Sequence, residues 1–189
     1  HRLGRAIALA LAGRGMRVTP LVIDSTKEVV DAFFAGRCAA YTSDASQLAA
    51  ARLRPSGGST FRILPDRISK EPLAPVVRSG DQTWLTLVRW VLFALIAAEE
   101  EGITRDNARE LGKGKGTGAG NTRRALGAAG ELGKALGTDP GWALRAVQSV
   151  GNYGEMFERN LGSQSWLKLE RGLNRLWTEG GLMYAPPMR

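Results

Sequence analysis

The sequence predicts an α/β protein that combines a parallel-type sheet in its first third with helices in the remainder. Between residues 1 and 69, apolar segments rich in Val and Ile alternate with helix-like segments of about ten residues, which is typical of a parallel sheet. From residue 70 onward the apolar residues recur mainly at helical spacing. The 189 residues are 43% hydrophobic, which is enough for a real core. We therefore divide the chain into residues 1–69 and residues 70–189.

In the first part, Ser25 has the properties of a helix N-cap, because Glu28 follows three residues later as in a capping box. The apolar residues that follow recur at helical spacing, and Gly36 supplies a stop. Helices are predicted at residues 3–12, 25–35 and 45–53, and strands at residues 17–23, 38–42 and 61–64.

The strongest element of the second part is a helix at residues 81–101, whose apolar side chains cover most of its circumference. Arg89 interrupts this stretch and Glu99-Glu100-Glu101 closes it. A membrane span needs about twenty apolar residues, so we interpret the segment as a core helix. Further helices are predicted at residues 105–111, 141–150, 154–160 and 166–177, whereas residues 179–189 are not expected to form regular helix.

The start of the chain imitates a signal peptide, since basic residues precede a short apolar stretch within residues 2–13. Arg14 and Arg17 follow at once, however, so a helix packed on a sheet is the preferred interpretation. Because the chain begins at His1 without a preceding loop, we expect a fragment from which the true signal peptide is missing.

The net charge of +8 favours acidic partners such as nucleic acid or anionic membrane. The Gly/Lys-rich loop at residues 112–120 has backbone N–H groups and lysines that would suit a phosphate. It lacks the preceding strand and the Ser/Thr of a Walker motif, so a surface loop is expected. A basic nucleic-acid-binding protein that uses this loop and its scattered Arg and Lys residues remains the alternative function.

The residues offer little for catalysis. His1 is the only histidine and lies at the terminus, which leaves no Ser-His-Asp or Cys-His pairing. No His/Cys/Asp/Glu cluster has metal-ligand spacing, and Glu99, Glu100 and Glu101 are expected to face solvent at a helix end. The sequence therefore predicts a protein that is not an enzyme and that holds no metal or cofactor.

Asp44 is the most informative polar residue of the first part. It precedes the helix at residues 45–53, and Gln47 follows three residues later, so a capping role explains it. It also follows the predicted strand at residues 38–42, and ligands of α/β sheets bind beyond the carboxyl ends of strands. A carboxylate has several lone pairs, so both roles can hold together. On the residues alone, capping is the favoured role.

Several blocks of sequence resemble the solute-binding proteins of general L-amino-acid ABC importers, which belong to the type II periplasmic binding proteins and to bacterial extracellular solute-binding family 3. The matching blocks follow in order from about residue 16 to the end. They are Arg-Cys at 37–38, Tyr-Thr-Ser-Asp at 41–44, Ile-Ser-Lys-Glu-Pro-Leu at 68–73, Ala-Ala-Glu-Glu at 97–100, Gly-Ile-Thr at 102–104, Val-Gly-Asn-Tyr-Gly-Glu-Met-Phe-Glu-Arg-Asn at 150–160, Glu-Arg-Gly-Leu-Asn at 170–174 and Gly-Gly-Leu-Met-Tyr-Ala-Pro-Pro at 180–187.

The resemblance implies a periplasmic-binding-protein-like fold of two α/β lobes that close on an amino acid by a hinge motion. The chain resembles only the C-terminal half of that fold. Residues 1–69 would form most of the second lobe, incomplete at its N-terminus. Residues 70–189 would form the return crossing and the C-terminal helices of the first lobe. The rest of the first lobe is expected to lie outside this chain.

The resemblance also assigns roles to single residues. Asp44 matches the aspartate that binds the α-ammonium group of the ligand, and Thr42 and Ser43 would line the same edge. Cys38 matches a cysteine that forms a disulfide with a partner outside this chain, which fits an oxidising periplasm. The implied partners are an L-amino acid and the membrane subunits of an ABC permease. No nucleic acid and no direct membrane insertion are expected.

Overall fold

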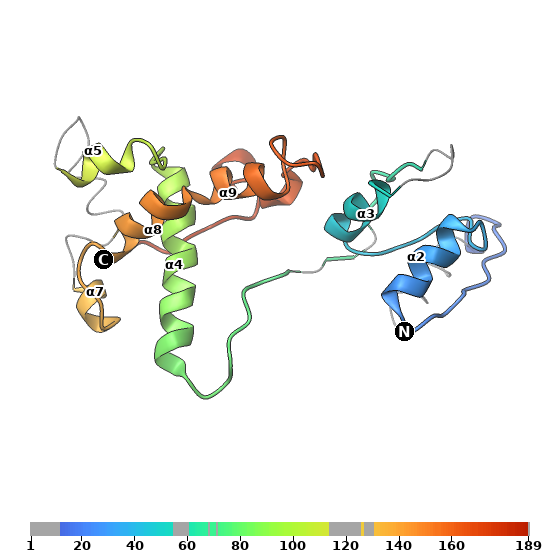
Figure 1. The fold of residues 1–189 in the computed structure, drawn as a ribbon, viewed down its shortest axis with the longest axis horizontal. Helices are drawn as coiled ribbons and strands as arrows, with labels where there is room; N and C mark the ends of the chain where they lie inside the picture. Colours follow the sequence, from blue (N-terminus) through green and yellow to red (C-terminus); the bar gives the residue numbers. More distant parts are fainter. Residues whose placement is uncertain are drawn as a thin grey trace. The chain divides into compact units, whose positions relative to one another are not determined.

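The chain divides into two compact units in the computed structural model (Figure 1). Unit 1 comprises His1–Leu73 and unit 2 comprises Ala74–Arg189. The residues that the structure describes are 12–54, 61–67, 69–70, 72–113, 126 and 131–188. The assignment of residues 1–69 and 70–189 to parts of two lobes stays a prediction.

Among its described residues, unit 1 contains the helices α2 (Thr26–Phe34) and α3 (Ala45–Arg52). The predicted N-cap of α2 is confirmed, because Ser25 Oγ accepts a hydrogen bond from the Glu28 N–H at 3.4 Å. At the other end, Gly36 adopts a φ of 73° and lets Arg37 N–H donate to the Ala32 carbonyl at 3.0 Å. The chain thereby leaves α2 in a tight turn toward the segment that holds the predicted ligand residues.

An aromatic cluster joins the helices of unit 1 to their neighbouring segments. The Phe33 ring lies 4.8 Å from that of Phe61 and 6.0 Å from that of Tyr41, centroid to centroid. Arg54 follows α3, binds Asp31 of α2 at 2.8 Å and lies over the Phe34 ring at 5.3 Å. Aromatic pairs of this kind contribute about 0.5–1.5 kcal/mol beyond their burial, so the cluster holds α2 against the segments that contain Tyr41 and Phe61.

The predicted strands of unit 1 have no β partners among the described residues. Residues 17–23, 38–42 and 61–64 are irregular there, and the predicted helix at 3–12 lies almost wholly outside the described part of the chain. A strand needs a neighbouring strand to satisfy its backbone groups. The α/β detail of the prediction is thus not found in the described residues, whose regular elements are helices.

Unit 2 is built around α4 (Gln82–Glu100), which Asp81 caps by accepting from the Trp84 N–H at 2.8 Å. Helices α8 and α9 lie across the C-terminal half of α4 (Figure 1). The core there is formed by small and apolar residues such as Ala94, Leu95, Ile103 and Val147. The other elements are α5 (Ala108–Gly112), α7 (Leu132–Ala135), α8 (Trp142–Val150), α9 (Tyr153–Asn160), η1 (Gly172–Asn174) and η2 (Trp177–Glu179).

Most helix predictions for unit 2 are confirmed within a few residues of their bounds, and one is wrong. The segment predicted as a helix at residues 166–177 is irregular apart from the short η1. Lys168 and Gly172 adopt φ values of 50° and 51°, which a right-handed helix does not allow. The chain end contains a parallel bridge between Leu176 and Met183, and residues 180–188 are not helical, as predicted.

Within the described residues, α4 alone is long and apolar enough to cross a membrane by length and composition. One such helix is weak evidence, because a buried core helix meets the same criterion. Ala94, Leu95, Ile96 and Ala98 of α4 are at most 4% exposed and pack inside unit 2. The C-terminal half of α4 therefore behaves as a core helix.

The start of α8 is fixed by Asp139. Its carboxylate accepts from the Gly141 N–H at 2.8 Å and binds the Arg145 guanidinium through both oxygens, at 2.8 and 2.6 Å. The hydrogen bonds from Arg145, helped by that from Gly141, hold the pKa of Asp139 at about 2, below its ordinary value of 3.8.

We expect Arg145→Gln to raise the pKa of Asp139 toward 3.8, because the largest cause of its depression is removed. Carboxyl-carbon NMR shifts followed against pH in the parent protein and in Arg145→Gln measure this directly. A depressed pKa stabilises the fold above pH 3.8, and this contribution is lost as the pH falls toward 2. An unchanged Asp139 titration in Arg145→Gln would contradict the assignment.

Candidate functional site

The predicted ligand residues lie in the connection between α2 and α3 of unit 1. Tyr41, which immediately precedes them, is held by the Phe33 ring of α2. The connection then enters α3 at Asp44, whose carbonyl accepts from the Leu48 N–H at 2.9 Å. Packing on one side and helix entry on the other thus position Thr42 and Ser43 in between.

Asp44 is the N-cap residue of α3, but its side chain makes no capping hydrogen bond. Gln47, the predicted partner, instead accepts a hydrogen bond from the Ser43 hydroxyl. The favoured capping interpretation of the Asp44 carboxylate was therefore wrong. This half-buried carboxylate has no hydrogen-bond partner among the described residues, and it lies at the positive end of a helix.

The other predicted residues differ in their surroundings. Thr42 is exposed, whereas Ser43 is half-buried and engaged with Gln47. Cys38 is half-buried and is a free thiol, and it is the only cysteine of the chain. The predicted disulfide therefore has no support.

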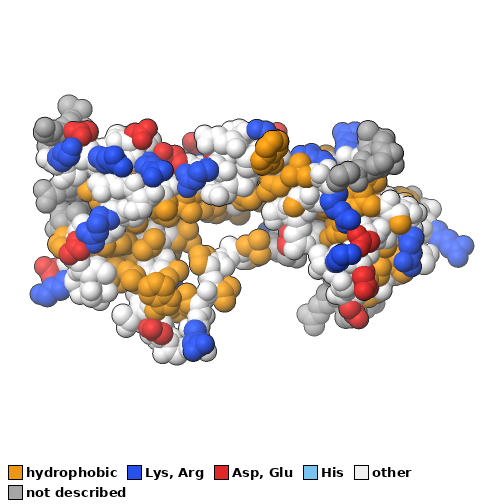
Figure 2. Space-filling view, in the orientation of Figure 1, with side chains coloured by type: hydrophobic (Ala, Val, Ile, Leu, Met, Phe, Trp, Pro, Cys, Tyr) orange, Lys and Arg blue, Asp and Glu red, His pale blue; other side chains and the backbone are white. Residues whose placement is uncertain are grey.

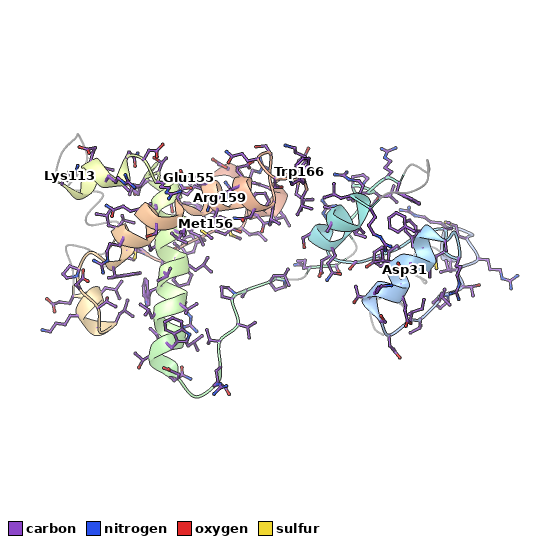
Figure 3. The ribbon with its side chains drawn as sticks, in the orientation of Figure 1. Asp31, Lys113, Glu155, Met156, Arg159 and Trp166 are labelled. Atoms are coloured by element: carbon purple, nitrogen blue, oxygen red, sulfur yellow. The ribbon has the colours of Figure 1, made fainter. Side chains whose placement is uncertain are left out.

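A hollow on the described part of unit 1 lies beside α2 and has a volume of about 630 Å³. Asp24, Glu28, Asp31 and Arg37 contribute its polar lining, and it does not include Thr42, Ser43 or Asp44. Figure 3 marks Asp31 on α2, where hydrogen bonds from Lys27, and then from Arg54, lower the pKa of its carboxyl. Asp31 is thus engaged in ion pairs with Lys27 and Arg54, and the hollow lies apart from the predicted ligand residues.

Unit 2 contains a half-buried ion pair that the sequence prediction missed. Arg171 binds both carboxylate oxygens of Glu99, with the Nη2 to Oε2 distance at 3.1 Å. The two side chains are 14% and 12% exposed, so the expectation that Glu99 faces solvent was wrong. The guanidinium also lies 5.6 Å from the Tyr153 ring centroid and 5.7 Å from that of Phe157.

The electrostatics of this pair favour the charged form of Arg171. Burial opposes the charge of Arg171, but the hydrogen bond and the charge of Glu99 outweigh it, so the pKa of Arg171 lies above its ordinary value. Burial also raises the pKa of Tyr153. Arg171 further donates to the Asn174 carbonyl at 2.7 Å. The pair therefore fastens the C-terminal segment to α4 and α9.

A second junction joins the end of α4 to the start of α9. Asn152, only 6% exposed, accepts from the Glu155 N–H at 2.9 Å and donates through Nδ2 to the Ile103 carbonyl at 2.9 Å. The Glu155 carboxylate accepts from the backbone N–H groups of Asn152, at 2.8 Å, and of Arg105, at 3.0 Å. Figure 3 marks Glu155 at this junction. Ile103, Asn152 and Glu155 fall within the sequence blocks that carry the resemblance, so their packing accounts for part of the similarity in those blocks.

We expect Asn152→Ala to lower the free energy of unfolding by about 2 kcal/mol, because it removes a helix cap and leaves the Ile103 carbonyl without its donor. Urea denaturation measures this change. Asn160→Ala is the matched control, since Asn160 makes only an exposed hydrogen bond to the Met156 carbonyl at the end of α9. Equal losses in the two variants would contradict the role of Asn152.

Neither a metal site nor a phosphate site emerges from the described residues. They contain no group of three or more His, Cys, Asp or Glu side chains that could hold a metal ion. Of the loop at residues 112–120, only Gly112 and Lys113 are described, and Lys113 pairs with Glu110 at 3.0 Å. The remainder of the predicted phosphate loop lies outside the described residues.

Comparisons with known proteins define the class of protein. The putative amino-acid ABC transporter-binding protein YhdW of Escherichia coli is 47% identical over 174 residues, which cover 92% of this chain and 50% of YhdW. The glutamate/glutamine/aspartate/asparagine-binding protein BztA of Rhodobacter capsulatus is 49% identical, with 92% and 51% covered. The general L-amino acid-binding periplasmic protein AapJ of Rhizobium johnstonii is 46% identical over 176 residues, with the same coverage as BztA. No protein-family model matches the chain.

A solved structure agrees with these relatives. A periplasmic binding protein of an ABC transporter from Brucella ovis, with glutathione bound, shows a TM-score of 0.82 and 41% identity. The likeness covers 98% of this chain and 58% of the Brucella chain.

Over 92% of its length the chain is therefore homologous to periplasmic binding proteins of amino-acid ABC transporters, as the resemblance predicted. It spans about half the length of the relatives that it matches, which is consistent with the predicted C-terminal half. These homologues are solute-binding proteins and not enzymes, and none supports the alternative of a nucleic-acid-binding protein.

Proposed function

We propose that this chain is part of the substrate-binding component of an ABC importer, which binds L-amino acids in a cleft between two lobes and delivers them to a membrane permease. The observation that carries this proposal is the 46–49% identity to amino-acid-binding proteins over 92% of the chain. A periplasmic location, the permease as partner and the lack of catalytic activity are parts of the same proposal.

In this proposal Asp44 binds the α-ammonium group of the ligand. A carboxylate that is half-buried and has no hydrogen-bond partner among the described residues is suited to a charged donor. Charge-assisted hydrogen bonds are about twice as strong as neutral ones, and more so where water is excluded. Thr42 offers an exposed hydroxyl next to it, whereas Ser43 would have to share its hydroxyl with Gln47.

Glutathione is a second candidate ligand, because the Brucella ovis protein binds it and is 41% identical. Glutathione carries a free α-amino acid head on its glutamyl residue. Asp44 would therefore serve an amino acid and glutathione in the same way. Glutathione is a tripeptide and is larger than a single amino acid, so the remainder of the site would have to leave more space for it.

A thermal-shift screen tests this proposal on a joined protein, in which this chain follows the half of BztA that lies outside the match. We expect L-glutamate, L-glutamine, L-aspartate, L-asparagine or glutathione to stabilise it, by about 2.7 kcal/mol at a hundred times Kd. The N-acetylated form of the best ligand should give no shift, because it lacks the ammonium. Equal shifts with the free and the acetylated ligand would contradict the role of Asp44.

A further inference from the structure

The start of α3 differs from the starts of α4 and α9 in what its capping residue does. Asp81 caps α4 by accepting from the Trp84 N–H at 2.8 Å. Asn152 caps α9 by accepting from the Glu155 N–H at 2.9 Å. Asp44 has the same place in α3 and a non-helical φ and ψ of −56° and 145°, as a cap requires, but its side chain makes no capping hydrogen bond. Backbone conformation therefore does not explain the free carboxylate.

The residue before the cap also differs between these helices. A glycine precedes the capping residue of α4 and of α9, and glycine has no side chain that could compete there. Ser43 precedes Asp44, and its hydroxyl donates to the Gln47 amide oxygen. Gln47 occupies the third position of α3, from which a capping box would close on Asp44. The hydrogen bond from Ser43 thus diverts one half of that box.

We propose that Ser43 is a positioning residue, which keeps the Asp44 carboxylate off the helix cap and free for the ammonium group of the ligand. The inference rests on the proposed function. To reach Ser43, the Gln47 side chain folds back by one turn over the start of α3, where a capping carboxylate would otherwise lie. Ser43 thereby acts through Asp44, because its hydroxyl hydrogen is donated to Gln47 and not to the ligand.

A free carboxylate matters in unit 1 because the unit offers a cation no general attraction. Lys and Arg outnumber Asp and Glu in residues 1–73, and the two kinds of side chain lie interspersed on the face of unit 1 that Figure 2 shows. An ammonium group therefore depends on a local acceptor. If Asp44 capped α3, the ligand would first have to displace that cap, which would weaken binding about five-fold.

Amide hydrogen exchange of the joined protein without ligand tests the first step. In the parent, we expect little protection of the Gln47 N–H, because no side chain caps it. Ser43→Ala should raise its protection factor about five-fold, because the Asp44 carboxylate then takes up the cap. Ser43→Thr keeps the hydroxyl and should retain the parent value. Ser46→Ala removes another hydroxyl from the same turn and is the matched control, with no expected change.

Calorimetric titration of the joined protein tests the second step. The ligand is whichever of L-glutamate, L-glutamine, L-aspartate and L-asparagine stabilises the joined protein most. Ser43→Ala should weaken its binding about five-fold, whereas Ser43→Thr and Ser46→Ala should stay within a factor of two of the parent Kd. In the Asp44→Asn background, Ser43→Ala should have no further effect, because the carboxylate through which Ser43 acts is gone.

Two results would overturn the inference. One is a Gln47 protection factor that does not rise in Ser43→Ala. The other is an equal loss of affinity from Ser43→Ala in the parent and in the Asp44→Asn background, which would indicate that Ser43 binds the ligand directly or serves only the fold. The exchange measurement needs no ligand. A rise in protection in a joined protein that binds neither an amino acid nor glutathione would therefore overturn the proposed function, while Ser43 would still hold the carboxylate off the cap.

Discussion

Arg171→Met will lower the free energy of unfolding of unit 2 by about 3 kcal/mol. Removing one partner of a buried ion pair costs about 3–5 kcal/mol, because the other charge is left without compensation. The lower end of that range applies here, since Arg171 and Glu99 keep 14% and 12% exposure. The variant also loses the contacts of the guanidinium with Tyr153 and Phe157.

Tryptophan fluorescence during urea denaturation measures this loss. All five tryptophans lie between residues 84 and 177, so the signal reports on unit 2 alone. Glu100→Gln is the matched control on the same helix end, because Glu100 is exposed and accepts only from the Trp177 indole at 3.0 Å. The double variant of Glu99→Gln with Arg171→Met should recover part of the loss. A cost for Arg171→Met no larger than that of Glu100→Gln would contradict the role of the pair.

Asp44→Asn will weaken amino-acid binding by the joined protein about 100-fold. The truncation of one partner of a buried, hydrogen-bonded charge pair costs about 2–5 kcal/mol, and each 1.4 kcal/mol is a factor of ten in Kd. Asparagine keeps the size and one acceptor oxygen of Asp44 but removes the charge that neutralises the ammonium. The fold of unit 1 should not change, since the Asp44 side chain makes no capping bond.

The matched control for this variant is Asp66→Asn, which makes the same change of charge at an exposed residue of the same unit. Its Kd should remain within a factor of two of the parent value. Equal affinities of the Asp44→Asn and Asp66→Asn proteins for the ligand would contradict the proposal that Asp44 binds it.

Local signals in the sequence predicted the helices well. Ser25 is the N-cap of α2, and the apolar periodicity after Asp81 predicts α4. Both signals are local, because caps and periodicity depend on neighbours within one or two turns. The strands predicted in unit 1 depend on distant partners, which the described residues do not provide. The prediction of a helix at residues 166–177 was wrong. Lys168 and Gly172 adopt positive φ values there, which a right-handed helix does not allow.

The position of Asp44 before a helix was predicted, but the contacts of its neighbours were not. Asp44 does precede α3, yet Ser43 and not Asp44 engages Gln47, a competition between adjacent side chains that residue spacing does not resolve. The pair of Glu99 and Arg171 was missed because its members lie 72 positions apart, and no local pattern links them. Resemblance to a family identified the blocks in which these residues lie, and the packing explains why they are paired.

The central claim is that the joined protein binds an L-amino acid. Calorimetric titration with L-glutamate, L-glutamine, L-aspartate and L-asparagine tests this claim most directly. We predict a heat of binding for at least one of them with a stoichiometry of one ligand per protein. The same titration in Asp44→Asn should show a greatly weakened isotherm. A folded joined protein that gives no heat with any L-amino acid or with glutathione would contradict the account.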